Sequence, residues 1–321
     1  MKKNIYLKKQ IEIFVGKEYL KSLFKINFHK TLFDFIIIYS LLAIIILSIY
    51  ILDTLSLLYF SIFSPFVMIL TAITFNWINV QVHEASHKLL FQKHFYNDLY
   101  CDALIGSWAL HDVKTYRTTH FDHHNKLHTD EDPDKIHYTS FTGSYRELIK
   151  GILHDLFSIT ALKRILQVLF SNNSNIQTKK RQKNYSLIFK IISQIIIIMI
   201  LYSFSGPMSF IYYFVFFLIP LFCIFPVLLR IRVIVQHYSS DLKKENLQNW
   251  ISRTTISNFF EHFIIGARMD YHFEHHLYPN IPYYNLKKLH FKLLNLGFFE
   301  NRNDYHTNDF AKSFVKLSTA K

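Results

Sequence analysis

Residues 35–52 read FIIIYSLLAIIILSIYIL, with no charged side chain, and a second uncharged stretch runs from Thr54 to Val82. A helix needs about 20 mainly apolar residues to cross the hydrocarbon core of a bilayer. Both stretches approach or exceed that length, and only Asp53 separates them. Pro65 interrupts the second stretch, but membrane helices tolerate proline better than soluble helices do. The sequence therefore predicts a transmembrane helical hairpin.

A further uncharged stretch runs from Ile191 to Leu229 and is divided by Gly206-Pro207. Each half approaches spanning length if the first begins near Tyr185, and Lys190 must then face protein or extend to the membrane surface. We therefore expect an all-α integral membrane protein, one domain over 1–321, with two transmembrane hairpins. The four predicted spans are about 33–52, 55–80, 185–205 and 208–229. Residues 99–110 are apolar but too short to cross, and we expect them to be interfacial or re-entrant.

The composition agrees with a membrane protein. Of the 321 residues, 50% are hydrophobic and 18% are charged, below the roughly 25% of typical soluble domains. The net charge of +13 would raise the question of nucleic acid in a soluble protein, but basic residues also gather on the cytoplasmic side of membrane proteins. Eight lysines precede Thr31, whereas the turns at Asp53 and Gly206-Pro207 contain no Lys or Arg. We expect no nucleic-acid partner, and a helical cap and both termini (1–30, 81–184 and 230–321) on the cytoplasmic side.

Three histidine clusters carry the functional prediction. They read His83-Glu-Ala-Ser-His87, His120-Phe-Asp-His123-His124 and His272-Phe-Glu-His275-His276. Residues three and four apart share one face of a helix, so each cluster presents two or three imidazoles together. The expected topology places all three clusters on one side, close to the membrane. Eight imidazoles exceed what one four- or six-coordinate ion can use, so the clusters predict two metal ions.

The remaining histidines receive plainer interpretations. A lone histidine in a polar segment is most often a surface residue or a local hydrogen-bond partner, which we expect for His29, His94, His137, His154, His290 and His306. His111, His128 and His262 are intermediate cases. His128 extends the second cluster by one helical turn, and it either joins the ligands or stands behind them.

The first cluster also matches H-E-x-x-H, in which two histidines bind zinc and the glutamate is the base of a metalloprotease. Such a protease needs one third ligand and an open position for water, and has no use for two further clusters. On a two-metal interpretation Glu84 either orients a ligand imidazole or is a solvated helix residue. An intramembrane protease is a remote alternative. A metal transporter would place its ligands midway across the bilayer, whereas these clusters lie outside the uncharged stretches.

The location of the clusters favours oxidation. A histidine site at the mouth of an apolar helix bundle suits a substrate whose hydrocarbon chain enters between the helices, and a hydrocarbon offers no group to hydrolyse. Imidazole binds zinc, copper, iron and nickel alike. Breaking an unactivated C–H bond requires a redox metal that activates dioxygen, which favours iron over redox-silent zinc.

The clusters, in this order around two hydrophobic hairpins, resemble the membrane fatty acid desaturase superfamily. These histidine-box di-iron enzymes include acyl and sphingolipid desaturases, alkane hydroxylases and carotenoid ketolases. The likeness extends from about Thr31 to His290. Details that favour the acyl desaturase branch are Leu90-Phe91, Tyr116-Arg117, Asp130-Glu-Asp-Pro-Asp134, Arg253-Thr254-Thr255, and Leu277, Pro279 and Ile281-Pro-Tyr-Tyr-Asn-Leu286 after the third cluster.

The resemblance implies a non-haem di-iron centre that uses O2 and is held by His83, His87, His120, His123, His124, His272, His275 and His276. The family often has a further ligand histidine shortly after the last span, where this chain has His237. Gln236 stands where many relatives carry Glu, and with Glu84 and His128 it is a candidate for contacts behind the ligands.

The resemblance also implies the reaction and its partners. We expect O2-dependent desaturation of a fatty acyl chain of a membrane lipid; a lipid or carotenoid hydroxylase or ketolase of the same superfamily is the alternative. The sequence contains no cytochrome b5-like His-Pro-Gly-Gly segment. Electrons are therefore expected from a separate ferredoxin or cytochrome b5-like protein, which the basic cytoplasmic surface could dock electrostatically.

Overall fold

The computed structural model describes residues 2–138, 144–170, 185–238, 252–266, 268–300, 305–307 and 309–319. These residues are mostly helical, as the sequence predicts. The exception is a two-residue parallel pair between β1 (Thr254–Thr255) and β2 (His306–Thr307). Parts of the expected cytoplasmic regions 81–184 and 230–321 lie outside the described residues.

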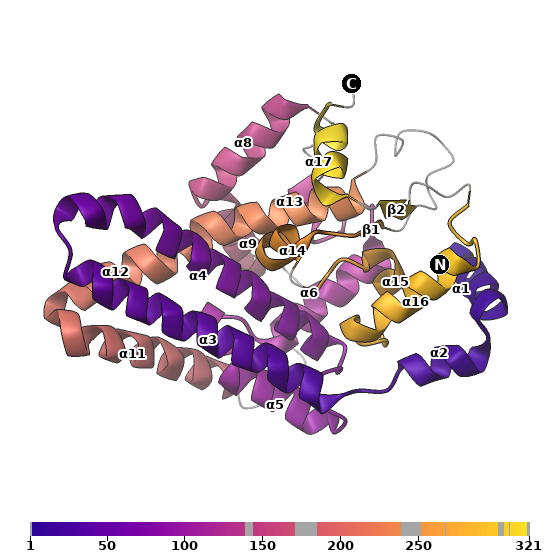
Figure 1. Ribbon diagram of the computed structural model, residues 1–321, viewed down its shortest axis with the longest axis horizontal. Helices are drawn as coiled ribbons and strands as arrows, with labels where there is room; N and C mark the ends of the chain where they lie inside the picture. The colour runs from indigo at the N-terminus through magenta and orange to yellow at the C-terminus, as the bar shows by residue number, and fades with distance from the viewer. Residues whose placement is uncertain are drawn as a thin grey trace.

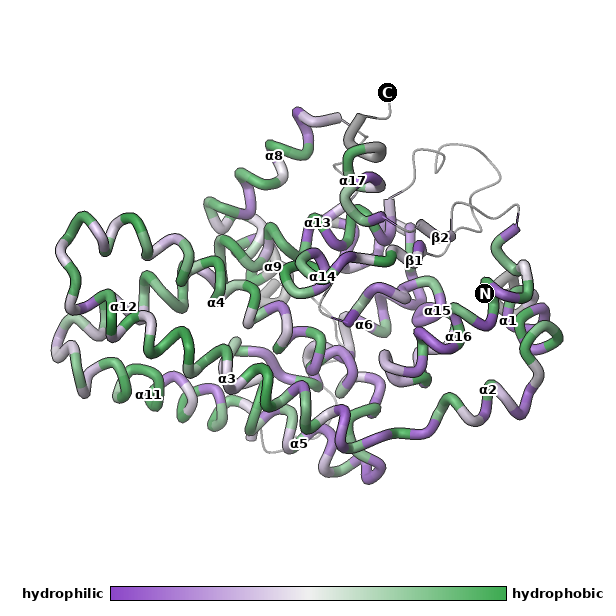
Figure 2. The backbone as a smooth tube through the Cα atoms, viewed as in Figure 1, coloured by the Kyte–Doolittle hydropathy of each residue, from purple (hydrophilic) through white to green (hydrophobic). Residues whose placement is uncertain are grey.

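The first predicted hairpin is formed by α3 (Phe28–Asp53) and α4 (Leu57–Ser86), which pack along their length. One face of α3 is fully buried through Ile38, Ile45 and Ile49, whereas side chains on its other faces remain exposed. Figure 2 shows that apolar residues dominate most of the length of these helices. A helix that is hydrophobic all round suits a membrane span.

The second pair of predicted spans forms one bent arm. It consists of α11 (Tyr185–Ser205), the 3-10 turn η2 (Gly206–Met208), α12 (Ser209–Tyr213), the π-helical turns η3 (Phe214–Leu218) and η4 (Pro220–Ile224), and α13 (Phe225–His237). Gly206 has a φ of 55°, which glycine adopts without steric cost. The chain reverses there (Figure 1), and the Tyr213 hydroxyl donates to Gln194 Oε1 at 2.7 Å across the two legs.

Three stretches are long and apolar enough to cross a membrane: Phe28–Asp53, Leu57–Ser86 and the 53-residue Tyr185–His237, which contains the reversal at η2. Helix α11 has the bounds of the predicted span 185–205, whereas the helices over the other predicted spans extend further. His83 therefore lies inside α4, and His237 lies at the end of α13. Of the two positions expected for Lys190, the structure shows the one facing protein, because its Nζ lies 2.6 Å from Asp112 Oδ2.

The remaining helices gather mainly at one end of the bundle (Figure 1). They are α1 (Lys2–Val15), α2 (Lys17–Leu23), α5 (His94–Leu104), η1 (Gly106–Ala109), α6 (Val113–Lys126), α7 (Lys135–Tyr138), α8 (Tyr145–Leu156), α9 (Ile159–Phe170), α14 (Phe259–Glu261), η7 (His262–Gly266), α15 (His272–Leu277), α16 (Tyr283–Asn295) and α17 (Phe310–Thr319). At this end of the molecule, an apolar core joins α1 and α2 to α15 and α16. This core fixes α15, which carries the third histidine cluster, to the N-terminal helices.

Candidate metal centre

The first histidine cluster ends helix α4. His83 lies in the last turn, and His87 caps its C-terminal end. The last carbonyls of a helix have no partner within the helix. Here Arg117 supplies one, because its Nε donates to the Ser86 carbonyl at 2.7 Å and its Nη2 donates to the Ala85 carbonyl at 2.9 Å. The turn that carries both histidines is thereby fixed to α6.

Arg117 is itself held in place from α5. Its Nη1 and Nη2 lie 2.7 and 2.6 Å from the two carboxylate oxygens of Asp98. Neighbouring Asn97 donates to the Ala85 carbonyl at 2.7 Å and accepts from the Leu90 amide at 3.0 Å. A two-pronged pairing of this kind fixes orientation as well as distance, so α5 acts as a brace for the first cluster.

The second cluster lies on α6, whose first turn is tied to helix α11. The Asp112 side chain caps α6 by accepting from the Thr115 amide at 2.7 Å, and its other oxygen pairs with Lys190 of α11. His120 and His123 are buried on this helix. The Lys190 pair therefore anchors α6 at a set height relative to the bundle.

The third cluster forms α15, where every residue is buried. Glu274, in the middle of the cluster, bonds to His290 Nδ1 at 2.6 Å and also accepts from the Thr254 hydroxyl. These contacts pin α15 to α16 on one side and to β1 on the other. His237, buried at the C-terminal end of α13, completes the set.

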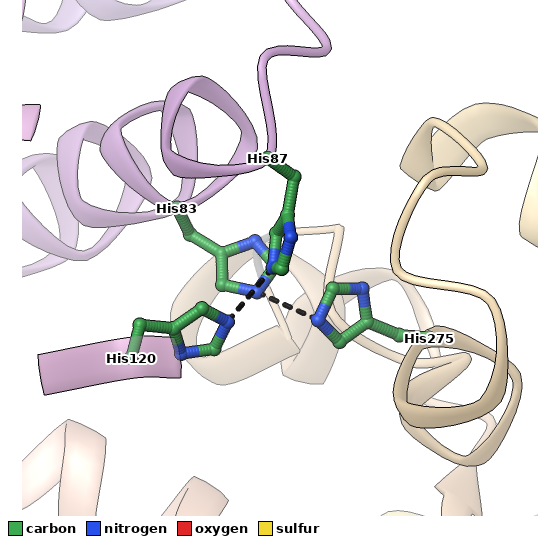
Figure 3. Close-up of side chains that lie close together, drawn as sticks. All are labelled: His83, His87, His120 and His275. Carbon is green, nitrogen blue, oxygen red and sulfur yellow. Dashed lines mark hydrogen bonds between the residues drawn. The ribbon is translucent and has the colours of Figure 1, made fainter. Parts of the chain in front are cut away.

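The structure brings eight of the nine predicted ligands together as two groups of four. The His83 group comprises His83, His87, His120 and His275, and the His237 group comprises His123, His237, His272 and His276. Within each group the candidate ligand nitrogens all lie within 4.8 Å of one another, and every member is buried. Figure 3 shows the His83 group, with imidazoles from three separate segments pointing at one another.

The nitrogen spacing fits metal ligation. In the His83 group, Nε2 of His83 lies 3.0 Å from Nε2 of His275. In the His237 group, His237 and His272 approach to 2.8 Å through the same atoms. Two nitrogens bound at about 2.1 Å to one ion, at right angles, are about 3 Å apart. Each group can therefore hold one metal ion.

His124, the ninth predicted ligand, lies between the groups. Its Nε2 is 3.0 Å from His120 Nε2 and 3.1 Å from His275 Nε2, and its ring centroid is 4.3 Å from that of His276. Its ring therefore lies close to members of both groups, and its Nε2 is in a position to add a ligand to the His83 group.

Four of the candidate ligands illustrate how the fold favours the neutral form that binds metals. Burial, followed by the repulsion of neighbouring imidazoles, places the pKa values of His120, His275 and His276 well below the usual range. Burial and the nearby Arg117 lower the pKa of His87 to about 3. A metal ion binds the neutral imidazole ring rather than the protonated imidazolium. At neutral pH, metal binding therefore does not have to displace the extra proton of an imidazolium from these residues.

A carboxylate fixes one imidazole in each group through its Nδ1 atom. Glu84 Oε1 lies 3.2 Å from His83 Nδ1, and Asp132 Oδ1 lies 2.8 Å from His123 Nδ1. Such contacts set the ring orientation and leave Nε2 free for the metal. Glu84 is 2% exposed, so it is not a solvated helix residue, and its contact with His83 suits the orienting role.

The other two candidates for contacts behind the ligands lie close to the His237 group but outside both sets of four. The His128 ring is 6.3 Å from that of His237. Gln236 Nε2 donates to the Met269 carbonyl at 2.7 Å, which ties α13 to the segment that leads into the third cluster.

Sequence reasoning missed several supporting residues. Among the lone histidines, His290 is fully buried and serves as a hydrogen-bond partner of Glu274, and His137 is also buried. Asp132 and Thr254 belong to stretches that resemble the family pattern, but that resemblance predicts no role for either residue. Among these residues, the sequence could have indicated Glu274 and Asp132. Each is an acidic residue within or just after a histidine cluster, where its carboxylate can orient an imidazole.

Comparison with known proteins bears on this geometry. The model of the family described as "Fatty acid desaturase" matches residues 29–302, which include all nine histidines. The chain belongs to the fatty acid desaturase family. The resemblance noted from the histidine clusters is thus confirmed. No curated protein matches the sequence. Membership of the desaturase family implies an oxidoreductase that acts on a lipid, and the buried histidine groups suit the di-iron centre typical of this family.

Proposed function

We propose that this desaturase-family chain is an O2-dependent enzyme that holds two iron ions and introduces a double bond into a fatty acyl chain of a membrane lipid. One observation carries the proposal: two buried four-histidine groups stand side by side at the end of an apolar helix bundle. In a desaturase-family chain, that arrangement suits a hydrocarbon chain that reaches the metals from the bundle.

The proposed ligands are the nine histidines His83, His87, His120, His123, His124, His237, His272, His275 and His276. Iron bound there would supply the O2 activation and redox chemistry needed to break two C–H bonds. The chain supplies neutral imidazoles, and it excludes water because the eight grouped histidines are buried. Glu84 and Asp132 hold ring orientation, and Gln236 positions the helix end that carries His237. His128 packs behind His237 as a neighbour of the ligands.

The position of Glu84 argues against the metalloprotease alternative. A protease base must reach the water bound in the open metal position. Glu84 instead contacts the Nδ1 side of His83, and its other oxygen accepts from the Tyr283 amide at 3.1 Å. Both carboxylate oxygens are therefore engaged away from the converging Nε2 atoms.

We further propose the topology and partners. Both helical segments of each predicted hairpin would cross the bilayer, giving four spans within one domain. The histidine groups and both termini would lie on the cytoplasmic side, where the basic residues lie. A separate ferredoxin or cytochrome b5-like protein would deliver electrons on that side.

Acyl-chain analysis tests the reaction. Cells that lack the activity would express wild-type protein, His272→Ala, or His94→Ala as a matched control at an exposed histidine. The proposal predicts a new unsaturated acyl species with the wild type and the control, and none with His272→Ala. A hydroxylated or keto product would favour the alternative members of the superfamily, and an unchanged lipid profile with well-expressed wild type would contradict the oxidative assignment.

A further inference from the structure

A fully buried carboxylate lies in the second turn of α3, where the first apolar stretch begins. Asp34 is 0% exposed, and its chain neighbours are Phe33 and Phe35. Ionisable side chains in membrane segments are costly, and they usually mark a functional site when they are paired. The proposed ligand set and its orienting carboxylates make no use of Asp34.

Asp34 gathers three donors from distant parts of the chain. The Tyr283 hydroxyl and Gln81 Nε2 both donate to its Oδ2, the latter at 3.1 Å. Arg268 Nη2 lies 3.4 Å from its Oδ1. Gln81 belongs to α4, whereas Arg268 and Tyr283 flank the third histidine cluster. Asp34 therefore connects the first hairpin to the segment that carries α15.

Arg268 is held in an unusual conformation. Its φ is 79°, a left-handed value that costs a non-glycine residue conformational energy. Its guanidinium carbon lies 5.3 Å from the Trp77 ring centroid and 5.8 Å from that of Tyr283. Two ring faces and one carboxylate thus fix this residue four positions before His272.

Tyr283 extends the connection to the histidines. Its hydroxyl binds Asp34, while its backbone amide donates to Glu84 Oε2 at 3.1 Å. The other oxygen of Glu84 contacts His83 Nδ1. A continuous chain of contacts therefore runs from Asp34 through Tyr283 and Glu84 to a member of the His83 group.

The His237 group is held by different contacts. Its orienting carboxylate is Asp132, which accepts from the Tyr138 hydroxyl as well as contacting His123. The bond from Gln236 to the Met269 carbonyl ties the third-cluster segment to α13, the helix of His237. His272 and His276 lie on the same segment as His275, but the other members of the His237 group come from α6 and α13, and none comes from α4. Loosening the Asp34 contacts to α4 would therefore leave these ties in place.

We propose that Asp34 is a positioning residue for the His83 group. It holds the segment 268–283, which carries His275, against α4, which carries His83 and His87, so that the four imidazoles meet at metal-binding distance. The inference rests on the proposed function in one respect, namely that each group holds an iron ion.

The informative substitution is Asp34→Asn, which keeps the shape of the side chain. An amide offers one acceptor oxygen in place of two, so its NH2 must face either Arg268 or the Tyr283 and Gln81 donors. The matched control is Asp53→Asn. Asp53 ends the same helix and also accepts from a tyrosine, Tyr212, at 2.6 Å, but it lies at the opposite end of α3.

Ferrous-ion binding to full-length purified protein, measured without turnover, separates the two groups. In the His272→Ala background the His83 group remains intact, and Asp34→Asn should weaken Fe2+ binding there by about 10- to 100-fold, the usual effect of losing support behind a ligand. In the His83→Ala background, where the His237 group is intact, Asp34→Asn should change binding less than about twofold. Asp53→Asn should change neither.

Each other outcome overturns the inference. Equal weakening in both backgrounds would show a general structural role, and unchanged binding in both would show none. If Asp34→Asn does not fold, as judged by thermal unfolding, Tyr283→Phe replaces it. This change removes the hydroxyl donor and keeps the hydrogen bond from the Tyr283 backbone amide to Glu84. It should weaken Fe2+ binding only where the His83 group is intact. Wild-type protein that binds no Fe2+ would refute the proposed function as well, whereas two bound ions with an inert Asp34→Asn would refute the positioning role alone.

Discussion

The Nε2 atoms of His83 and His275 lie 3.0 Å apart, although 192 positions separate the two residues in the sequence. His83 comes from the last turn of a long apolar helix, and His275 comes from a short helix pinned between α16 and β1. Within α15, His272 and His276 also approach to 3.1 Å through their Nε2 atoms, but the contact between His83 and His275 requires both helices. The candidate centre is therefore a product of the tertiary fold, and changes to individual residues should affect it in distinguishable ways.

Replacing His123 or His272 by Ala should abolish turnover, with a loss of at least about 100-fold, because even changes behind a metal ligand cost 10- to 100-fold. Membrane insertion should persist, since the apolar helices are untouched. Acyl-product yield per folded protein measures the effect. His29→Ala and His94→Ala, at exposed positions, are the controls and should retain normal turnover. Near-normal activity of His123→Ala would refute the two-group assignment.

His237→Ala should be as damaging as a change in the three clusters. His237 is 2% exposed, and its Nε2 lies 2.8 Å from that of His272. Loss of one ligand should lower bound iron in the His237 group and abolish product formation. Iron per chain and product yield should be measured on the same preparation. Full iron content with ordinary turnover would remove His237 from the ligand set.

Asp155→Asn should destabilise the protein without touching a proposed ligand. Arg230 Nε and Nη2 lie 2.5 and 2.9 Å from the carboxylate of Asp155, and both residues are buried. Removing one partner of a buried ion pair costs about 3–5 kcal/mol. Glu131→Gln, at the exposed pair with Lys126, should have a much smaller effect, because ion pairs in solvent contribute little to stability. Thermal unfolding in detergent compares them, and equal effects would contradict a structural role for the buried pair.

Asp112→Asn should remove a pH-dependent contribution to stability. Burial alone would raise the pKa of Asp112, but the hydrogen bonds from Lys190 and from the Thr115 amide outweigh burial and lower it. A lowered folded-state pKa gives stability that is full above the unfolded value of about 3.9 and is lost as pH falls through the folded value. Asn remains a good helix cap, so the variant isolates the charge.

The measurement is unfolding of wild type and Asp112→Asn across pH. The wild type should be more stable at pH 7 by about 1.5–3 kcal/mol, the range for a hydrogen bond to a charged group. This difference should shrink as the pH falls below about 4. A difference that is constant with pH would mean that the charge of Asp112 does not act through Lys190.

Cysteine labelling tests the topology. Asp130 and Ser56 are both exposed, and the proposal places Asp130 on the cytoplasmic side and Ser56 in the opposite turn. An impermeant thiol reagent added to intact cells should label Ser56→Cys and spare Asp130→Cys. Labelling of both positions from outside would contradict the proposed four-span arrangement.

Local spacing predicted much of this molecule. Uncharged stretches located the long helices, and the three- and four-residue spacing of the histidines predicted that each cluster shares a face. Spacing could not predict how the clusters divide. His120 and His123 are one helical turn apart on α6, yet they belong to different groups. Helix α6 thus contributes ligands to both groups.

Residues far apart in the sequence were the least predictable. The Asp34 carboxylate and the Tyr283 hydroxyl are 249 positions apart and meet only in the folded chain. In the sequence, Asp34 is a single charge just before the uncharged stretch 35–52, and no neighbouring residue indicates its partners. Lys190 was an intermediate case: its apolar surroundings limited it to two positions, and only the fold identified Asp112 as its partner.

The iron content of purified wild-type protein tests the central claim most directly. The protein would be expressed in iron-replete cells, purified in detergent, and measured by elemental analysis against its chain concentration. The account predicts two iron ions per chain, one for the His83 group and one for the His237 group. A single zinc ion per chain, or no bound transition metal in folded protein, would contradict it.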